Sequence, residues 1–235
     1  MKRTFIASKS LLMAGVLLAL VGGCGGKDSP ASYDIDTLGV PKFVSTNYID
    51  LTQTDGIGNF IINRISRFRS SDGHDYADQV ETCRSMKHYF KVPDESTAIY
   101  SPVAGTITTV RYEWAGAQIH IRSDAQPAFT FIIFHIDEAR PFAVGEKVPE
   151  GFRLGNHIGT MTNSDIAVAV ITPQGYRLIS YFETLTDDAL RPFTDRKPTI
   201  LADVIITKAE RDAAPLVCTG ETFTGPDTLD KEISF

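Results

Sequence analysis

Short segments rich in β-branched and apolar residues, separated by turn residues, fill the middle of the chain and constrain its fold more than any other feature. Residues 106–112 are rich in β-branched side chains, and residues 118–122 alternate strictly between polar and apolar ones. Residues 129–136 and 165–172 are almost entirely apolar, which is typical of strands covered on both faces, and residues 176–182 read as a further strand. Short strands at this spacing indicate a β-sandwich or barrel, so we predict a mainly β fold.

Helical signals replace the strand pattern in the last quarter of the chain. Thr186 precedes two acidic residues and is expected to cap a short helix, and residues 200–213 have helical apolar spacing in their first half. The polar tail 219–235 is expected to be loosely held unless Cys218 pins it. The chain therefore divides into a signal peptide (1–23), a tether (24–35), a β domain (36–185), and a short helical appendage with a tail (186–235).

The first 24 residues have the organisation of an export signal. A basic start is followed by an apolar stretch over residues 11–21, which is too short to span a bilayer comfortably. The sequence Val21-Gly22-Gly23-Cys24 resembles the bacterial lipobox, which implies that Cys24 is the lipidated first residue of the mature protein. Cleavage nearby with Cys24 as a bystander is the alternative. Gly25 is not the aspartate associated with inner-membrane retention, so we expect a lipid anchor in the outer membrane, facing the periplasm.

The cysteine count agrees with export. If Cys24 carries lipid, Cys83 and Cys218 remain, and exported compartments permit them to form a disulfide. Two unpaired, buried thiols are the alternative. We predict the disulfide.

The charge balance argues against nucleic acid as a partner. The formal net charge is -6, from 23 basic and 29 acidic residues. The predicted signal peptide holds three of the basic residues and none of the acidic ones, so the mature chain is more acidic still. An acidic surface repels phosphate backbones.

The histidines include one pair with a spacing that suits metal binding. His74 and Asp78 are four residues apart, which places both side chains on one face of a strand or a helix, and imidazole plus carboxylate is half of a zinc site. The alternative is that the pair hydrogen-bonds a turn. His88 falls in a polar segment, predicted to be an inserted loop, and is expected in solvent. His120 alternates with isoleucines and could point into a ligand groove.

The order of the short motifs resembles the lysostaphin/LytM-type peptidoglycan endopeptidases. A His-x-x-x-Asp motif comes first, and a strand that ends in His135 stands between two Gly-containing turns. The segments that carry the resemblance are residues 74–78, 100–107, 134–136, 144–148 and 154–160. The resemblance implies the duplicated hybrid motif, a β-sandwich or barrel, over roughly residues 58–172.

The resemblance also implies roles for single residues. It makes His74 and Asp78 zinc ligands and His135 a histidine that assists catalysis near the metal. The family ends its site with His-x-His, where this chain has Asp165 and Ala167. Alanine cannot bind zinc, although Asp165 shares its face of the strand and could replace it. The resemblance requires His74, Asp78, His135 and Asp165 to converge in one cleft.

We therefore predict a cell-envelope lipoprotein with a degenerate, non-hydrolytic endopeptidase-like domain in which zinc is either retained or lost. Such a domain would bind peptidoglycan or regulate a cell-wall enzyme. The first alternative is an active zinc metallo-endopeptidase that cleaves peptidoglycan cross-bridges, with Asp165 as the substitute ligand. The second is a carbohydrate- or peptide-binding module.

Overall fold

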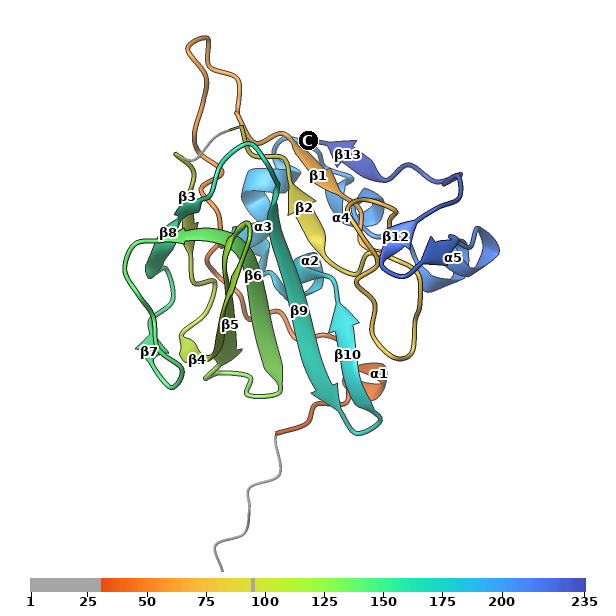
Figure 1. Ribbon diagram of the computed structural model, residues 1–235, viewed down its shortest axis with the longest axis horizontal. Coiled ribbons are helices and arrows are strands. Elements are labelled where there is room, and N and C mark those ends of the chain that lie inside the picture. Colours follow the sequence, from red (N-terminus) through yellow and green to blue (C-terminus); the bar gives the residue numbers. More distant parts are fainter. Residues whose placement is uncertain (1–30, 94–95) are drawn as a thin grey trace, which may run out of the picture.

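The computed structural model describes residues 31–93 and 96–235, which are built around a large antiparallel sheet (Figure 1). The predicted signal peptide, Cys24 and residues 24–30 of the predicted tether lie outside the described residues. The strands are β1 (Arg64–Ser66), β2 (His88–Phe90), β3 (Ala98–Tyr100), β4 (Gly105–Glu113), β5 (Gly116–Ser123), β6 (Phe129–Glu138), β7 (Lys147–Val148), β8 (Arg153–His157), β9 (Ser164–Thr172), β10 (Gly175–Ile179), β11 (Cys218–Thr219), β12 (Thr222–Phe223) and β13 (Glu232–Ser234). The helices are α1 (Ile35–Leu38), α2 (Tyr181–Thr184), α3 (Asp187–Thr194), α4 (Ile200–Asp203) and α5 (Lys208–Ala213). None of these helices is long and apolar enough to cross a membrane.

The mainly β prediction is confirmed, and the long predicted strands are β4, β5, β6 and β9. The sheet has the order β13-β1-β2-β9-β6-β5-β4-β7, with β10 beside β9 and β8 beside β6 and β3. Strands β6 and β9 lie at its centre, where Phe129 pairs with Val170 and Ile133 with Ile166. The larger hydrophobic core packs on one face of these strands and a smaller hydrophobic cluster on the other, which explains why the two segments are almost wholly apolar.

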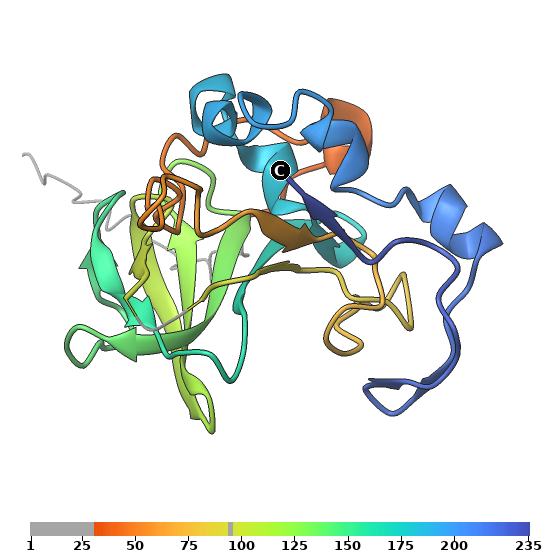
Figure 2. The same ribbon diagram turned by 90° about the horizontal axis from the view of Figure 1, so that it is seen from above.

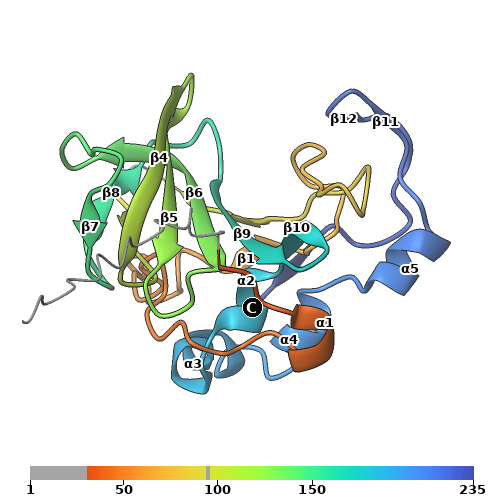
Figure 3. The same ribbon diagram turned by 90° about the horizontal axis from the view of Figure 1, so that it is seen from below.

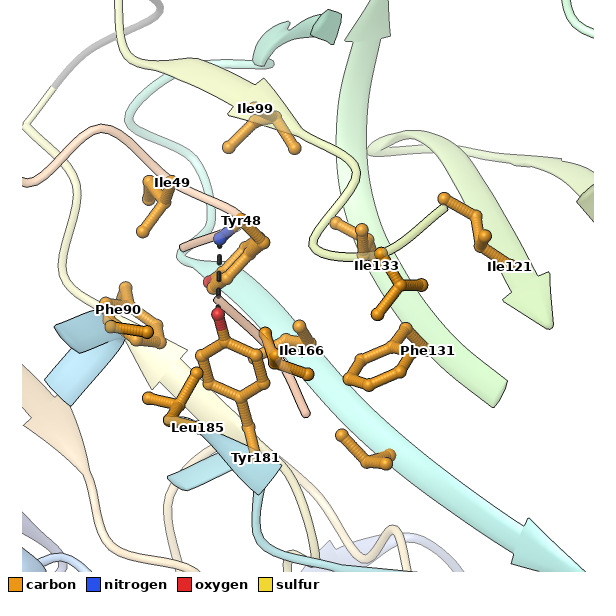
Figure 4. Close-up of a cluster of buried hydrophobic side chains, with 14 of the residues drawn as sticks. Tyr48, Ile49, Phe90, Ile99, Ile121, Phe131, Ile133, Ile166, Tyr181 and Leu185 are labelled. Carbon is orange, nitrogen blue, oxygen red and sulfur yellow. Dashed lines mark hydrogen bonds between the residues drawn. The ribbon is translucent and has the colours of Figure 1, made fainter. Parts of the chain in front are cut away.

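The larger hydrophobic core lies on one face of the sheet, with Tyr48 and Tyr181 fully buried inside it (Figure 4). The Tyr48 backbone N–H donates to the Tyr181 hydroxyl at 3.2 Å. The Tyr48 hydroxyl in turn donates to the Ser164 carbonyl at 3.1 Å. Buried hydroxyls need such partners, and here they also fix the first residue of β9.

A smaller hydrophobic cluster lies on the other face of β6 and β9. Side chains alternate between faces along a strand, so the larger core takes Phe131 and Ile133 of β6 and the smaller cluster takes Ile132 and Phe134. The other members of the smaller cluster are Phe68, Met86, Ala167, Ala169 and Leu178.

The helices and two hairpins lie on opposite sides of the molecule. Helices α1 to α4 gather on one side of the sheet (Figure 2). The β4–β5 and β11–β12 hairpins project on the side away from these helices (Figure 3). The smaller hydrophobic cluster is therefore left between two projections.

Two local expectations changed, and a third was confirmed. The strand expected over residues 176–182 ends at Ile179, because Ser180 caps helix α2 with a capping box. The prediction that His88 is in solvent was wrong: it lies in β2, fully buried, with hydrogen bonds to the Ser66 carbonyl and the Ser180 hydroxyl. Thr186 caps α3 as predicted.

The predicted disulfide is confirmed and joins Cys83 to Cys218, which are 135 residues apart. The tail beyond it is held at two further points. Strand β13 pairs with β1, and the Phe235 ring lies 5.2 Å from that of Phe193. The C-terminal tail thus belongs to the edge of the sheet.

Candidate functional site

A cleft of about 780 Å³ opens on the sheet face that carries the smaller hydrophobic cluster. Ile132 and Phe134 of that cluster line it from β6. One wall contains Trp114 at the tip of the β4–β5 hairpin, and Glu221 and Thr222 of the β11–β12 hairpin line it as well. The two projections in Figure 3 therefore contribute side chains to the same cleft.

The ammonium group of Lys87 lies within this cleft. Its side chain is 2% exposed, and its Nζ donates to Oδ2 of Asp165 at 2.9 Å. The same nitrogen lies 3.3 Å from Nε2 of His74. A lysine this deeply buried has to be paired, and the Asp165 carboxylate supplies the opposite charge.

Three aromatic rings surround the same ammonium group. Its Nζ lies 4.1 Å from the ring centroid of Phe134, 4.8 Å from that of Tyr89 and 5.0 Å from that of Tyr76. Aromatic faces carry partial negative charge and attract cations at these distances. Burial raises the pKa of both tyrosines, so their hydroxyls stay neutral.

The Lys87–Asp165 ion pair forms the centre of the cleft, and His74 and His135 each direct their Nε2 atom toward it. Nδ1 of His74 lies 3.0 Å from the Asp75 carbonyl, and Nδ1 of His135 lies 3.2 Å from the Ala115 carbonyl. A carbonyl only accepts, so each Nδ1 carries the proton and donates it. Nε2 of His74 then faces Lys87, and Nε2 of His135 lies 3.3 Å from Oδ2 of Asp165.

The backbone around His135 explains how its ring reaches the cleft. Strand β6 pairs with β9 as far as Ile133 and with β8 from Ile136 onward, so His135 lies where the strand changes partner. Its φ of 61° is in the left-handed region, which costs free energy for a residue other than glycine. This bend turns one side chain of an apolar strand into the cleft.

Asp165 is the acidic group of the centre and is only 1% exposed. It lies on β9, directly opposite Tyr89 of β2. Its Oδ2 contacts Lys87 and His135, whereas its buried Oδ1 has no hydrogen-bond partner among the described residues.

Asp78 lies outside this group. Its Oδ1 accepts from the backbone N–H groups of Val80 and Glu81 at 2.9 and 2.8 Å. Its Oδ2 accepts from the Leu178 N–H at 3.0 Å and from Nε of Arg177 at 3.3 Å. The segment around it is neither helix nor regular strand, so the spacing of four does not place His74 and Asp78 on one face.

A zinc ion, which the resemblance left as either retained or lost, does not fit the residues as they stand. Ala167 is buried in the smaller hydrophobic cluster and has no donor atom. Within the described residues there is no group of three His, Cys, Asp or Glu side chains placed to hold a metal ion. The Lys87 ammonium lies between Asp165 and His74, and its positive charge would repel a second cation there.

The cleft continues as a groove along the open face of the sheet. His120, Ile132 and Tyr176 line both the cleft and a neighbouring hollow of about 200 Å³. That hollow shares Thr108 and Thr130 with a third one of about 580 Å³. His120 thus lies in the groove, and burial together with nearby Arg111 lowers its pKa to about 4, which keeps it neutral.

Two arginines mark the ends of this groove. Arg111 lines the cleft, and Arg122 lines the most distant hollow. Both are exposed, and neither side chain forms an ion pair or hydrogen bond within the described part of the chain. Arg111 of β4 pairs with Gln118 of β5, and Arg122 lies four residues further along β5. At about 3.3 Å per residue, the arginine side chains therefore leave the sheet about 13 Å apart.

Lys87 and the two groove arginines were not among the predicted site residues. No motif marks Lys87, because its position depends on how β2 pairs with β9. An alternation signal could have found Arg122, which shares a face of β5 with His120.

Comparison with known proteins gives matches among solved structures. No family model and no curated protein matches the chain. A LytM-type glycyl-glycine endopeptidase from Ruminococcus gnavus is similar at 15% identity and a TM-score of 0.34, covering 42% of this chain and 43% of that one. The catalytic domain of a prophage-encoded M23 protein from Enterococcus faecalis is similar at 17% identity and a TM-score of 0.36, over 51% and 88% of the two chains.

The catalytic domain of lysostaphin from Staphylococcus simulans is similar at 14% identity and a TM-score of 0.34, over 57% and 92% of the chains. The matched region spans about half the length of the first three solved structures, at 43%, 46% and 52%. Several of the similar structures are named as LytM, lysostaphin or M23 peptidases, the group that the motif order resembles.

Proposed function

We propose that this protein is a cell-envelope lipoprotein, anchored through Cys24 in the outer membrane, whose β domain binds peptidoglycan without hydrolysing it. The observation that carries the proposal is the groove. It is large enough for a polymeric ligand, yet the side chains expected to hold a catalytic metal at its deep end already contact other protein groups.

The groove surface suits a glycan that bears acidic peptides. Trp114 is 75% exposed at one wall, and Tyr176 is 41% exposed further along. Such rings can pack against the apolar faces of sugars and peptides. The guanidinium groups of Arg111 and Arg122 have no ion-pair or hydrogen-bond partner among residues 31–93 and 96–235, and guanidinium binds carboxylates in bidentate fashion.

The ammonium group at the deep end of the groove supports a role without hydrolysis. A metal lowers the pKa of a bound water and holds the attacking hydroxide at an open coordination position. An ammonium group has no such position, and all the Lys87 contacts described above are to protein groups. Asp165 and His135 remain close to each other. The positive charge beside Asp165 is the ammonium group of Lys87, which belongs to the protein.

The proposal is tested with the mature chain without its predicted lipid anchor, starting at Gly25 after Cys24, and insoluble peptidoglycan sacculi. The protein should sediment with sacculi, and replacing Arg111 and Trp114 by alanine should weaken binding about tenfold, equivalent to about 1.4 kcal/mol. Arg191→Ala on α3 is the matched control, because that arginine is also exposed and lies outside the groove. Soluble muropeptides should not accumulate, with or without added zinc.

Each part of the proposal has its own contrary result. Release of muropeptides would refute the non-hydrolytic role. Failure to sediment, or equal binding by the groove variant, would refute peptidoglycan as the ligand of the groove. If the chain failed to bind sacculi but altered the rate of a purified cell-wall hydrolase, the regulatory role would replace it.

A further inference from the structure

A row of polar side chains crosses the sheet at the end of the groove opposite the cleft. Lys147 of β7 pairs with Thr106 of β4. Thr106 also pairs with Arg122 of β5, which pairs in turn with Thr130 of β6. Residues directly opposite one another on neighbouring strands carry their side chains on the same face. All four line the hollow of about 580 Å³ at this end of the groove, and we call them the polar row.

Most of the polar row has no partner within the protein. Among residues 31–93 and 96–235, neither the guanidinium of Arg122 nor the hydroxyls of Thr106 and Thr130 form a hydrogen bond. Lys147 forms an ion pair with Asp124 at 2.6 Å, but these two side chains are 66% and 47% exposed. Such an exposed pair contributes little stability, so the ammonium group can contact a further anion. Two cations and one carboxylate leave the hollow with a net positive charge.

This set of donors suits a phosphodiester. A phosphodiester carries one negative charge on two free oxygens, and the planar guanidinium of Arg122 can bind both in bidentate fashion. Threonine hydroxyls stand on both sides of Arg122, at the spacing of about 4.8 Å between neighbouring strands. Lysine binds phosphate as a point charge, and Lys147 lies two strands from Arg122. The polar row can therefore hold one phosphate group.

The polar row lies on the side of the sheet from which the chain leaves toward Cys24. Ala31 lines the same hollow. The Tyr33 backbone N–H donates to the Ile171 carbonyl at 2.9 Å, and the Tyr33 ring lies 5.4 Å from that of Phe129. Figure 1 shows that the described chain starts at the end of the sheet where β6 begins and β9 ends. Only seven residues lead from Cys24 to Ala31, so the two are at most about 25 Å apart.

We propose that the polar row binds the headgroup phosphate of an anionic phospholipid in the membrane that holds the lipid anchor. The inference rests on the Cys24 anchor of the proposed function, and it does not depend on what the rest of the groove binds. A short tether raises the effective concentration of a nearby ligand to the millimolar range, so a weak site is sufficient. Basic side chains close to an anionic membrane are attracted to its surface even on an acidic protein.

Docking through the polar row fixes which end of the groove faces the membrane. Trp114 at the hairpin tip stands eight residues beyond Thr106, which is about 26 Å along an extended strand. The cleft that Trp114 lines therefore opens away from the membrane. This orientation presents the cleft to a ligand that lies beyond the lipid surface.

The test uses the chain from Cys24 onward, coupled through the Cys24 thiol to a maleimide lipid in vesicles. Cys83 and Cys218 form the disulfide, so Cys24 is the one thiol that can be coupled. The vesicles contain phosphatidylcholine alone or with about one third of phosphatidylglycerol, which makes them anionic. Acylation of Lys147 by an uncharged reagent, followed by mass spectrometry, reports whether its ammonium group is covered. The coupling supplies the anchor, so the result does not depend on whether cells attach lipid to Cys24.

Lys147 should be acylated about threefold more slowly on the anionic vesicles than on phosphatidylcholine, and added salt should remove the difference. Arg122→Gln should reduce this protection to below about 1.5-fold, because one basic side chain changes binding to an anionic surface about fivefold. Arg191→Gln is the matched control, because that arginine is exposed and lies on α3, and it should keep the protection. Lys208 on α5 is the internal control, because it is another exposed lysine in an ion pair with an aspartate. It should react equally on both vesicles.

Four results would overturn the inference. Equal acylation of Lys147 on both vesicles would show that the polar row does not dock. Full protection in Arg122→Gln would show that something other than the polar row covers Lys147. Equal protection by inorganic phosphate on phosphatidylcholine vesicles would assign the site to a soluble phosphate. Weaker sacculus binding by Arg122→Gln, with Lys147 unprotected on anionic vesicles, would assign Arg122 to a carboxylate of the cell wall.

The vesicles contain no peptidoglycan, so the two proposals fail separately. A wild-type chain that does not sediment with sacculi, but whose Lys147 is protected on anionic vesicles, would refute peptidoglycan as the ligand and support the phospholipid site.

Discussion

Removal of the Cys83–Cys218 disulfide should destabilise the fold by several kcal/mol. The bond closes a loop of 135 residues, and the loop-entropy relation for that length gives about 5 kcal/mol at 25 °C. The loop contains β2, β6 and β9, so the unfolded chain loses much of its freedom when the bond is present. The native state is already held by the sheet, and therefore the effect falls mainly on the unfolded state.

The assay is urea unfolding of the mature chain, with the Cys83→Ser/Cys218→Ser variant beside the oxidised wild type. We expect a loss of about 3–5 kcal/mol, because measured effects tend to fall below the entropic value. Reduced wild type should behave like the variant. The β11–β12 hairpin begins at Cys218 and places Glu221 in the cleft, so the variant should also bind sacculi more weakly. A loss below about 1 kcal/mol would refute the loop-entropy reasoning.

Three further predictions concern buried ionisable groups. Lys87→Met should cost about 3–5 kcal/mol in urea unfolding, because it leaves Asp165 buried without a counter-charge, and unchanged stability would contradict this. Burial lowers the pKa of His88 to about 4 from an ordinary 6.5, so as the pH falls the unfolded state takes up a proton first. Relative to His88→Gln, the wild type should therefore lose about 3 kcal/mol of stability between pH 7 and 4, and parallel pH profiles would rule this out. Arg211→Met should cost about 3–5 kcal/mol, because Arg211 is fully buried and forms two hydrogen bonds to Asp227 in the tail, whereas the exposed Arg191→Met should stay within about 0.5 kcal/mol.

The long strands β4, β5, β6 and β9 could be predicted because each carries its own pattern. Segments such as Phe129–Glu138 are long, apolar and bounded by turn residues, so their periodicity is sufficient. His88 could not be placed, because its polar neighbours disguise a three-residue strand whose burial comes from Ser66, Ser180 and the rings beside them.

The candidate site was harder to predict, because it depends on segments that meet only in three dimensions. The spacing of His74 and Asp78 would place them together only in a regular helix or strand. The chain there is irregular, and the Asp78 carboxylate stabilises it by accepting backbone hydrogen bonds. The contribution of His135 depends on a left-handed residue at which β6 changes its partner. Lys87 depends on the pairing of β2 with β9, which no local pattern encodes.

The groove combines a closed centre with an open rim, and the two have different physical characters. At the centre, Lys87 and Asp165 are nearly inaccessible and neutralise each other, so they offer an incoming ligand little net charge. At the rim, Arg111 and Arg122 are exposed and unpaired within the described residues, on a chain whose net charge is negative. Long-range attraction of an acidic ligand must therefore come from the rim, where it will weaken as salt is added. The centre instead stabilises the deep end of the groove through the Lys87–Asp165 ion pair, whose cation is a side chain and cannot dissociate from the protein.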